Sequence, residues 1–409
     1  MPSVCLYFKV HHPFQLKQYN SKEIGVCHIY EDVTADTAAI NALADACYLP
    51  ANAIILSAIA KHQGKFKVNF SMSGVLISLL QKHRPDVIES FRSLTATGFV
   101  EIMAETYYHS LSYLHSKKEF DRQVEKHSQL VVEIFGVKPR IFRNTELIYN
   151  NSLASHVAGL GYAGILCEGI ERLLKGRTHN KIYKAPGIDR FSLLLRNSVL
   201  SDDISFRFDD ASWNEHPLTA DKFAEWIHMH PSDTEVINLF MDYETFGIHK
   251  KPTTGIFDFL EVLPTEVLKD HHFDFVTASG VIEKYEASDE YDVPKTISWE
   301  DKTKECCVWC DNMMQNNTLK KIYSLEKMVT YANDEHLQEV WGRLQAADYF
   351  YYMANQDCTN NNHYYNPFET PGNAYKNYTN IITDFEISLI KKALEGKEFA
   401  TYSSVGMLY

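Results

Sequence analysis

Apolar runs of strand length alternate with longer amphipathic segments through the first 285 residues of the chain. The runs expected to form strands are residues 4–10, 66–72, 99–105, 139–146, 163–169, 191–197 and 235–244, and a further apolar segment follows at 273–285. Helical periodicity is expected over residues 74–94, 118–136, 152–162 and 220–230. Strands that alternate with helices predict parallel βαβ units. Seven or eight such strands indicate an α/β fold with a barrel of the TIM type, complete or incomplete.

The pattern changes after residue 285. Residues 291–305 and 356–378 are polar and rich in turn-forming residues, whereas 319–332, 335–355 and 379–398 show helical periodicity. The chain contains no internal repeat and no low-complexity tract. We therefore predict two domains, an α/β barrel at residues 1–285 and a C-terminal helical domain at residues 286–409.

Charge and hydropathy narrow the range of partners. The net charge of −13 lacks the basic footprint expected for binding nucleic acid or an anionic membrane. The N-terminus has no basic region before a long apolar stretch, and no run of 18 apolar residues follows it. We expect a soluble, cytoplasmic protein with no nucleic-acid or membrane partner, whereas the oligomeric state is not indicated.

Cysteines are scattered through the chain, which favours free thiols over a disulfide framework in a large protein without a signal sequence. The eight are Cys5, Cys27, Cys47, Cys167, Cys306, Cys307, Cys310 and Cys358. One Cys-x-x-Cys pair, formed by Cys307 and Cys310, has no second ligand pair at the spacing of a zinc site. A zinc site at these cysteines is therefore not expected, and nothing else in the sequence indicates a metal or a cofactor.

Polar residues collect where the predicted strands end. They are His11, Glu101, Glu105, Glu146, Asp242 and Glu244. Any one of them has an ordinary structural explanation, since a single histidine is often a hydrogen-bonded core residue and an aspartate after a strand is often a helix N-cap. Together they indicate chemistry, because reacting residues of parallel barrels lie at the carboxyl ends of the strands.

The stretch "FRNTELIYNN", residues 142–151, places Glu146 at the end of an apolar strand. A buried carboxylate is costly unless another group pairs with it or uses it. Arg143 lies close before Glu146 and is placed to keep a nucleophilic carboxylate ionised. Glu146 and Asp242 come from different strands, as do the two carboxylates of a retaining glycosidase. The alternative is an arginine–carboxylate pair that only stabilises the rim of the barrel.

Four segments, in this order, resemble the first four signature regions of glycoside hydrolase family 57. They are "VHHPFQL", "GFVEIMAE", "IFRNTELIYNN" and "FMDYETFG". The resemblance covers roughly residues 5–355 and is strongest to the intracellular α-amylase and α-amylase-like members. It implies an incomplete (β/α)7 TIM-like barrel followed by a C-terminal α-helical bundle that contributes to the substrate groove. It also implies retaining action on α-glucans, with no required metal.

The resemblance also suggests roles for individual residues. Glu146 matches the catalytic nucleophile and Asp242 the general acid/base. The positions expected to contact substrate are His11, Glu101, Arg143, Trp309 and Tyr349. Two departures put binding in doubt: His12 stands where the family usually has glutamine, and Tyr349 stands where it often has histidine.

Several functions stay open at this point. The first is an α-amylase-like hydrolase of α-1,4-glucans, and the same site could serve a 4-α-glucanotransferase or a branching enzyme. A catalytically weak glucan-binding homologue is the second, although both Glu146 and Asp242 are present. A metal-dependent carbohydrate deacetylase is the third, but "HMH" at residues 228–230 lacks the spacing for two ligands on one helix face.

Overall fold

The computed structural model describes residues 1–287, 289–300, 304–305, 307–355 and 366–405 of the chain. The chain divides into two compact units. We call Met1–His12, Thr37–Tyr107 and Arg122–Trp299 the barrel unit. The helical unit comprises Pro13–Asp36, Tyr108–Asp121 and the described part of Glu300–Tyr409.

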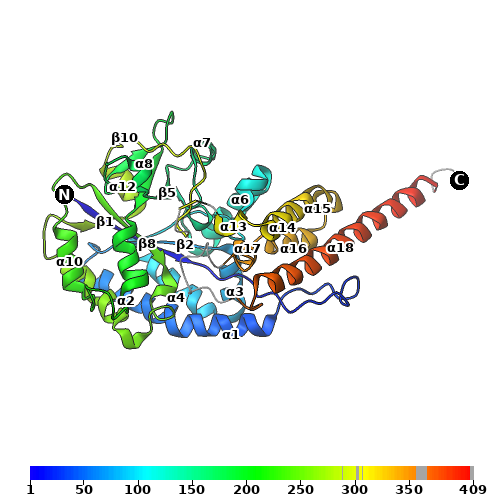
Figure 1. Ribbon diagram of the computed structural model, residues 1–409, viewed down its shortest axis with the longest axis horizontal. Coiled ribbons are helices and arrows are strands. Elements are labelled where there is room, and N and C mark those ends of the chain that lie inside the picture. The colour runs from blue at the N-terminus through cyan, green and yellow to red at the C-terminus, as the bar shows by residue number, and fades with distance from the viewer. Residues whose placement is uncertain (288, 301–303, 306, 356–365, 406–409) are drawn as a thin grey trace. The chain divides into compact units, whose positions relative to one another are not determined.

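The strands all belong to the barrel unit and form two sheets. Their bounds are β1 (Ser3–Val10), β2 (Val68–Met72), β3 (Val100–Ile102), β4 (Ile141–Phe142), β5 (Gly164–Glu168), β6 (Ile182–Lys184), β7 (Ser192–Arg196), β8 (Val236–Asp242), β9 (Asp274–Phe275) and β10 (Asp289–Glu290). One sheet has the order β3-β2-β1-β8, with β9 paired to the start of β1, and the other has the order β10-β6-β7-β5-β4. Figure 1 shows β1 and β8 side by side in the barrel unit, where they pair in parallel.

The two sheets are separate ladders, but isolated backbone hydrogen bonds connect their edges at two places. Ala104, just beyond β3, donates to the carbonyl of Ile141 and accepts from the backbone of Arg143, at 2.9 and 2.8 Å. Beside β7 and β8, the Asn197 backbone donates to the carbonyl of Asn238 at 2.9 Å. The parallel strands therefore follow one another as β1-β2-β3-β4-β5-β7-β8, without continuous ladder pairing at these two places. The α/β class and the incomplete barrel predicted from the sequence are confirmed.

Several helices of the barrel unit begin at a polar side-chain cap directly after a strand or loop. Ser73 follows β2 and its hydroxyl accepts from the Leu76 backbone at 3.3 Å, and Asn197 follows β7 and accepts from Leu200 at 3.1 Å. The helices up to residue 299 are α1 (Val33–Leu43), α2 (Leu49–Lys61), α3 (Gly74–His83), α4 (Pro85–Ala96), α5 (Ser112–His115), α6 (Lys117–Phe135), α7 (Asn151–Gly159), α8 (Glu171–Leu174), α9 (Ser198–Asp202), α10 (Ala220–His228), α11 (Ile256–Val267) and α12 (Ala278–Lys284). The strand–cap–helix order is the local basis of the βαβ repeat.

The continuous helical stretch Val33–Lys61 has the length and mean hydropathy of a membrane span. Half of its most apolar 18-residue window is buried inside the structure. The buried side chains include Ile40, Ile55 and Ile59, so this apolar surface contributes to the packed interior.

The helical unit contains α13 (Cys307–Cys310), α14 (Met313–Ser324), α15 (Glu326–Ala332), α16 (Glu335–Arg343), α17 (Ala347–Tyr351) and α18 (Pro371–Val405). The predicted C-terminal helical region is therefore present. Its division from the barrel differs from the boundary predicted at residue 285. Two earlier segments, 13–36 and 108–121, join the helical unit because they bond to its helices. Arg343 pairs with Glu31 at 2.8 Å, and Gln345 donates to Glu119 at 3.0 Å.

Five cysteines are free thiols, as the sequence predicted: Cys5, Cys27, Cys47, Cys167 and Cys310. Cys306, Cys358 and the side chain of Cys307 lie outside the described residues. The expectation that Cys307 and Cys310 form no zinc site therefore stays a prediction.

Candidate active site

Six strands of the barrel unit place a charged residue two positions after an apolar core residue. The core residues Tyr7, Met103, Ile141, Leu166, Leu194 and Phe240 belong to one buried cluster. Because successive side chains alternate between faces along a strand and its extended continuation, the residues two positions further on face the same interior. They are Lys9, Glu105, Arg143, Glu168, Arg196 and Asp242, which we call the charged ring. It lies at the carboxyl ends of the strands, where parallel barrels carry their reactive groups.

Charges of opposite sign meet around this ring. Lys9 Nζ lies 2.9 Å from Asp242 Oδ1. Arg143 Nη1 lies 3.8 Å from Glu105 Oε2, and Arg196 Nη1 lies 3.4 Å from Glu168 Oε2. All three cations are almost fully buried. Buried charges are tolerated when such partners compensate them, so the ring is built for function or for specificity rather than as surface charge.

Glu146 enters this ring from the segment after β4. Its Oε1 lies 3.2 Å from Lys9 Nζ, so one ammonium group contacts both Glu146 and Asp242. The two contacted oxygens consequently lie no more than about 6 Å apart, which is compatible with the roughly 5–5.5 Å separation of a retaining pair. Only about 6% of the Glu146 side chain is exposed, against 22% for Asp242.

The backbone at Glu146 adopts a left-handed conformation, with φ 54° and ψ 31°, and Leu147 follows with φ 48°. Such a conformation costs a non-glycine residue about 1–3 kcal/mol, and the surrounding structure must enforce it. Here Asn144 Nδ2 donates to the Ile148 carbonyl at 2.9 Å and Ser298 Oγ donates to the Glu146 carbonyl at 3.0 Å. Strain of this kind concentrates at functional positions, because it fixes the direction of one side chain.

Trp299 holds the second oxygen of Glu146. Its indole Nε1 donates to Glu146 Oε2 at 2.8 Å. The same ring lies 5.3 Å from Lys9 Nζ and 5.6 and 5.5 Å from the guanidinium carbons of Arg143 and Arg196. Cations near an aromatic ring face are attracted to it, so Trp299 contacts three cations with its ring and one carboxylate with its N–H.

Arg143 is fully buried, and among the described residues its guanidinium nitrogens make no hydrogen bond. Burial alone would lower the pKa of Arg143. The Tyr7 phenol and the carboxylates of Glu146 and Glu105 outweigh burial, so the pKa lies above its ordinary value. A permanent positive charge at this depth keeps adjacent carboxylates ionised, as expected beside a nucleophile.

Glu244 lies two residues after Asp242 and is buried behind it. Its Oε1 accepts a hydrogen bond from the Tyr48 hydroxyl at 2.6 Å. Burial, and next the negative charge of Asp242, raise the pKa of Glu244 to about 7. Glu244 is therefore a carboxyl that changes its charge near neutral pH in the immediate neighbourhood of Asp242.

We predict that Glu244→Gln weakens the dependence of stability on pH. The folded wild type keeps the Glu244 proton up to about pH 7, whereas the unfolded chain releases it near 4.5, so stability falls as pH rises through this window. Glutamine has no proton to lose, so the variant should gain up to about 3 kcal/mol on the wild type between pH 4.5 and pH 8. Urea unfolding of both proteins at the two pH values measures the gain. An unchanged difference would mean that the Glu244 pKa is ordinary.

The structure brings together only part of the predicted site. Glu146, Asp242 and Arg143 meet as described, and His11 lies two residues beyond Lys9 with Nδ1 2.7 Å from Ser73 Oγ. Glu101 is placed elsewhere, in the middle of β3, where its carboxylate accepts from the backbone and hydroxyl of Ser279 at 2.8 and 2.5 Å.

The other two predicted substrate contacts belong to the helical unit. Trp309 is buried, with its ring 6.3 Å from that of Tyr351. The Tyr349 hydroxyl donates to the Phe14 carbonyl at 2.8 Å. For these residues and for Glu101, substrate binding stays a prediction.

Three residues that contact the site were missed or passed over from the sequence: Lys9, Glu105 and Trp299. Lys9 carried a usable signal, because a lysine inside an otherwise apolar strand needs a buried anion. Glu105 shares its strand face with Glu101 and lies nearer the carboxyl end. Trp299 gave no signal, because it lies in a segment without periodicity. In the described part of the chain, no group of three His, Cys, Asp or Glu side chains is placed to hold a metal ion.

Comparison with known proteins shows the family of the chain. The sequence model of glycosyl hydrolase family 57 matches residues 5–294. A Methanocaldococcus jannaschii protein named "Putative alpha-amylase" is 39% identical over 410 aligned residues, covering 97% of this chain and 86% of that protein.

Solved structures resemble the whole fold at low sequence identity. The α-amylase AmyC from Thermotoga maritima superposes with a TM-score of 0.66 at 13% identity, covering 98% of this chain and 96% of that one. A family 57 branching enzyme from Pyrococcus horikoshii superposes with a TM-score of 0.65 at 14% identity, covering 96% and 88%. At such identities the likeness concerns the fold alone.

Proposed function

Because the chain belongs to glycosyl hydrolase family 57 and is a glycoside hydrolase, we propose that it cleaves α-1,4-glucans by a retaining double displacement. The name of the Methanocaldococcus jannaschii relative supports an α-glucan substrate. The observation that carries the mechanism is the contact of Lys9 with both Glu146 and Asp242, which holds the two carboxylates close enough for a retaining pair.

In this proposal Glu146 attacks the anomeric carbon and forms the glycosyl-enzyme, while Asp242 gives a proton to the departing oxygen. Asp242 then takes a proton from the incoming water. The surroundings suit these roles, since Glu146 is fixed by Lys9 and Trp299 whereas Asp242 is the more exposed of the pair. A nucleophile benefits from rigid placement, and an acid/base must exchange protons with solvent.

Transfer to a second sugar, as in a 4-α-glucanotransferase or branching enzyme, uses the same first step and differs only in the acceptor. Incubation with maltoheptaose and with glycogen, followed by separation of the products, distinguishes these outcomes. Shorter oligomers alone indicate hydrolysis, and longer oligomers or new branch points indicate transfer. Binding of glucan without any product would contradict the proposal and favour a glucan-binding protein.

We predict that Lys9→Met lowers kcat on maltoheptaose by about 10²-fold and moves the acidic limb of the pH–rate profile upwards. Without the ammonium, two close carboxylates repel each other, so the pKa of one rises and Glu146 is ionised only at higher pH. Lys9→Arg keeps the charge and should keep the position of this limb. An unaltered acidic limb in Lys9→Met would mean that Lys9 acts by packing alone.

A further inference from the structure

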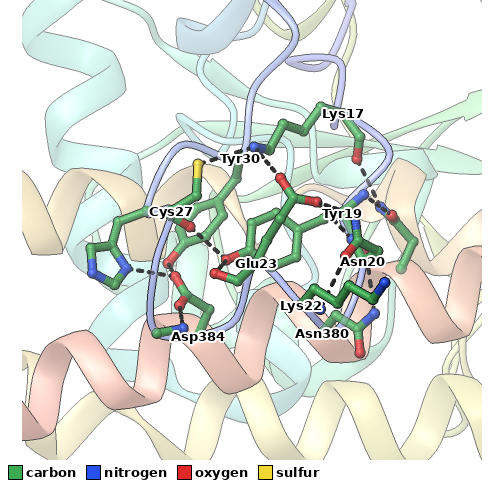
Figure 2. Close-up of polar contacts among 12 residues, drawn as sticks. Lys17, Tyr19, Asn20, Lys22, Glu23, Cys27, Tyr30, Asn380 and Asp384 are labelled. Atoms are coloured by element: carbon green, nitrogen blue, oxygen red, sulfur yellow. Dashed lines mark hydrogen bonds and ion pairs between the residues drawn. The ribbon is translucent and has the colours of Figure 1, made fainter.

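The segment Pro13–Asp36 is fastened to α18 within the helical unit (Figure 2). The carboxylate of Asp384 accepts from the Gly25 backbone and the Tyr30 hydroxyl at 2.6 and 2.7 Å. Asn377 and Asn380 donate to the carbonyls of Lys17 and Tyr19, both at 3.1 Å. These bonds define the path of the segment, so the distances between side chains within it are set by the fold.

An amine, a thiol and a carboxylate meet on this segment. Lys17 Nζ lies 3.2 Å from Cys27 Sγ and 2.9 Å from Glu23 Oε1 (Figure 2). The second oxygen of Glu23 accepts from the backbone and side-chain nitrogens of Asn20, at 2.9 and 2.8 Å. Lys17 also lies 5.0 Å from the centre of the Tyr19 ring. The Glu23 carboxylate and the Tyr19 ring thus hold the Lys17 ammonium group beside the Cys27 sulfur.

Cys27 differs from the three buried thiols in its surroundings. Cys5, Cys47 and Cys167 are buried, and burial raises the pKa of each. Cys27 is half-buried, and the backbone N–H of Ile29, followed by Lys17, lowers its pKa. Since the thiolate is the reactive form of cysteine, Cys27 combines access with reactivity.

We propose that Lys17 and Cys27 form a peroxide-responsive modification site in which oxidation joins the two side chains by a sulfur–nitrogen bond. The Cys27 thiolate attacks one oxygen of hydrogen peroxide, the O–O bond breaks, and a sulfenic acid forms. The Lys17 ammonium gives a proton to the departing hydroxide, which leaves as water. Sulfur is oxidised by two electrons and the peroxide is reduced.

The second step uses the amine that the first step leaves neutral. Lys17 Nζ attacks the sulfenic sulfur, the S–O bond breaks, and hydroxide leaves as water with a proton from the nitrogen. Sulfenic acids condense with nitrogen in this way, and the product is reversible by thiols. The 3.2 Å separation is already that of a near-attack arrangement, which is about 3–3.5 Å.

The test treats the full-length protein with hydrogen peroxide and analyses peptides by mass spectrometry without reduction. The expected product joins the peptides of residues 17 and 27, is lighter than their sum by two hydrogen atoms, and separates with dithiothreitol. Cys310→Ser is the matched control at another partly exposed thiol and should form the same product. Cys27→Ser should not form it.

Two Lys17 variants separate the role of the amine from that of the charge. Lys17→Arg keeps a cation beside the sulfur, so Cys27 should still react with dimedone after peroxide treatment but form no link. Lys17→Met should form no link and react more slowly with peroxide. An unmodified Cys27, or its passage to sulfinic acid without a link in the wild type, would overturn the proposal. Glucan turnover plays no part in this test, so its outcome is independent of the proposed function.

Discussion

Replacing Glu146 with alanine is expected to lower turnover of maltoheptaose by at least about 10³-fold, because the double displacement loses its nucleophile. The effect should fall on kcat rather than on substrate binding, since the carboxylate acts on the reacting carbon. Initial rates with wild type and variant measure the loss, and circular dichroism confirms that the variant is folded. Glu283→Gln, at an exposed carboxylate paired with Arg140, is the matched control and should change the rate less than about twofold.

Azide provides the decisive addition to this experiment. In Glu146→Ala a small anion can occupy the space of the lost carboxylate and attack the anomeric carbon from the face opposite to the leaving group. With an activated aryl α-maltoside as substrate, the product should be the glycosyl azide of inverted, β configuration, which nuclear magnetic resonance identifies. A rescued product of α configuration would contradict the assignment of Glu146 as the nucleophile.

The proximity of Glu146 and Asp242 could be predicted from the sequence because each comes at the end of an apolar run expected to form a strand, although β4 itself covers only Ile141–Phe142. Parallel strands bring their carboxyl ends to one side of a barrel, so residues far apart in the chain meet there. Strand alternation also predicts that Arg143 faces the same side as the core residue Ile141, two positions before it. Which residues share one face or one end of a strand can therefore be predicted from the sequence. For this reason the α/β class and the proximity of the two carboxylates were predictable.

Which residues of neighbouring strands lie side by side around the barrel is harder to predict from the sequence. Glu101 and Glu105 lie four residues apart on one strand face, and the sequence alone does not say which one reaches the site. The backbone hydrogen bonds of Ala104 with Ile141 and Arg143 extend the strand pairing beyond the end of β3. Glu105, which follows Ala104, is therefore the glutamate that reaches the site. Lys9 was overlooked for a similar reason, since its two partners come from other strands.

Two further features of the site cannot be predicted from the sequence around the residues concerned. Trp299 reaches Glu146 from a segment without periodicity, and only the tertiary fold brings the two together. The left-handed backbone at Glu146 is imposed by bonds from Asn144 and Ser298, whereas glutamate itself disfavours it. The segment 13–36 likewise joins the helical unit through side chains such as Asp384, which lies far away in the sequence.

Replacing Asp242 with alanine is expected to produce a loss that depends on the leaving group. Cleavage of maltoheptaose expels a sugar alkoxide, which needs a proton, so the rate should fall by about 10³-fold. An aryl α-maltoside with two nitro groups expels a stable phenolate, so formation of the glycosyl-enzyme should be slowed far less. Comparison of the two substrates, with the burst of released phenolate recorded, separates this role from that of Glu146, whose loss should impair both substrates alike.

Azide also distinguishes Asp242 from Glu146 by stereochemistry. In Asp242→Ala the glycosyl-enzyme still forms on Glu146, and its hydrolysis is slow because no base activates water. Azide needs no base, and it should attack the intermediate from the side where Asp242 stood, giving the α-glycosyl azide. The wild-type arrangement supports this expectation, since Asp242 is the exposed member of the pair and its removal opens that side to solvent. An inverted product, or equal losses with both leaving groups, would show that Asp242 is not the acid/base.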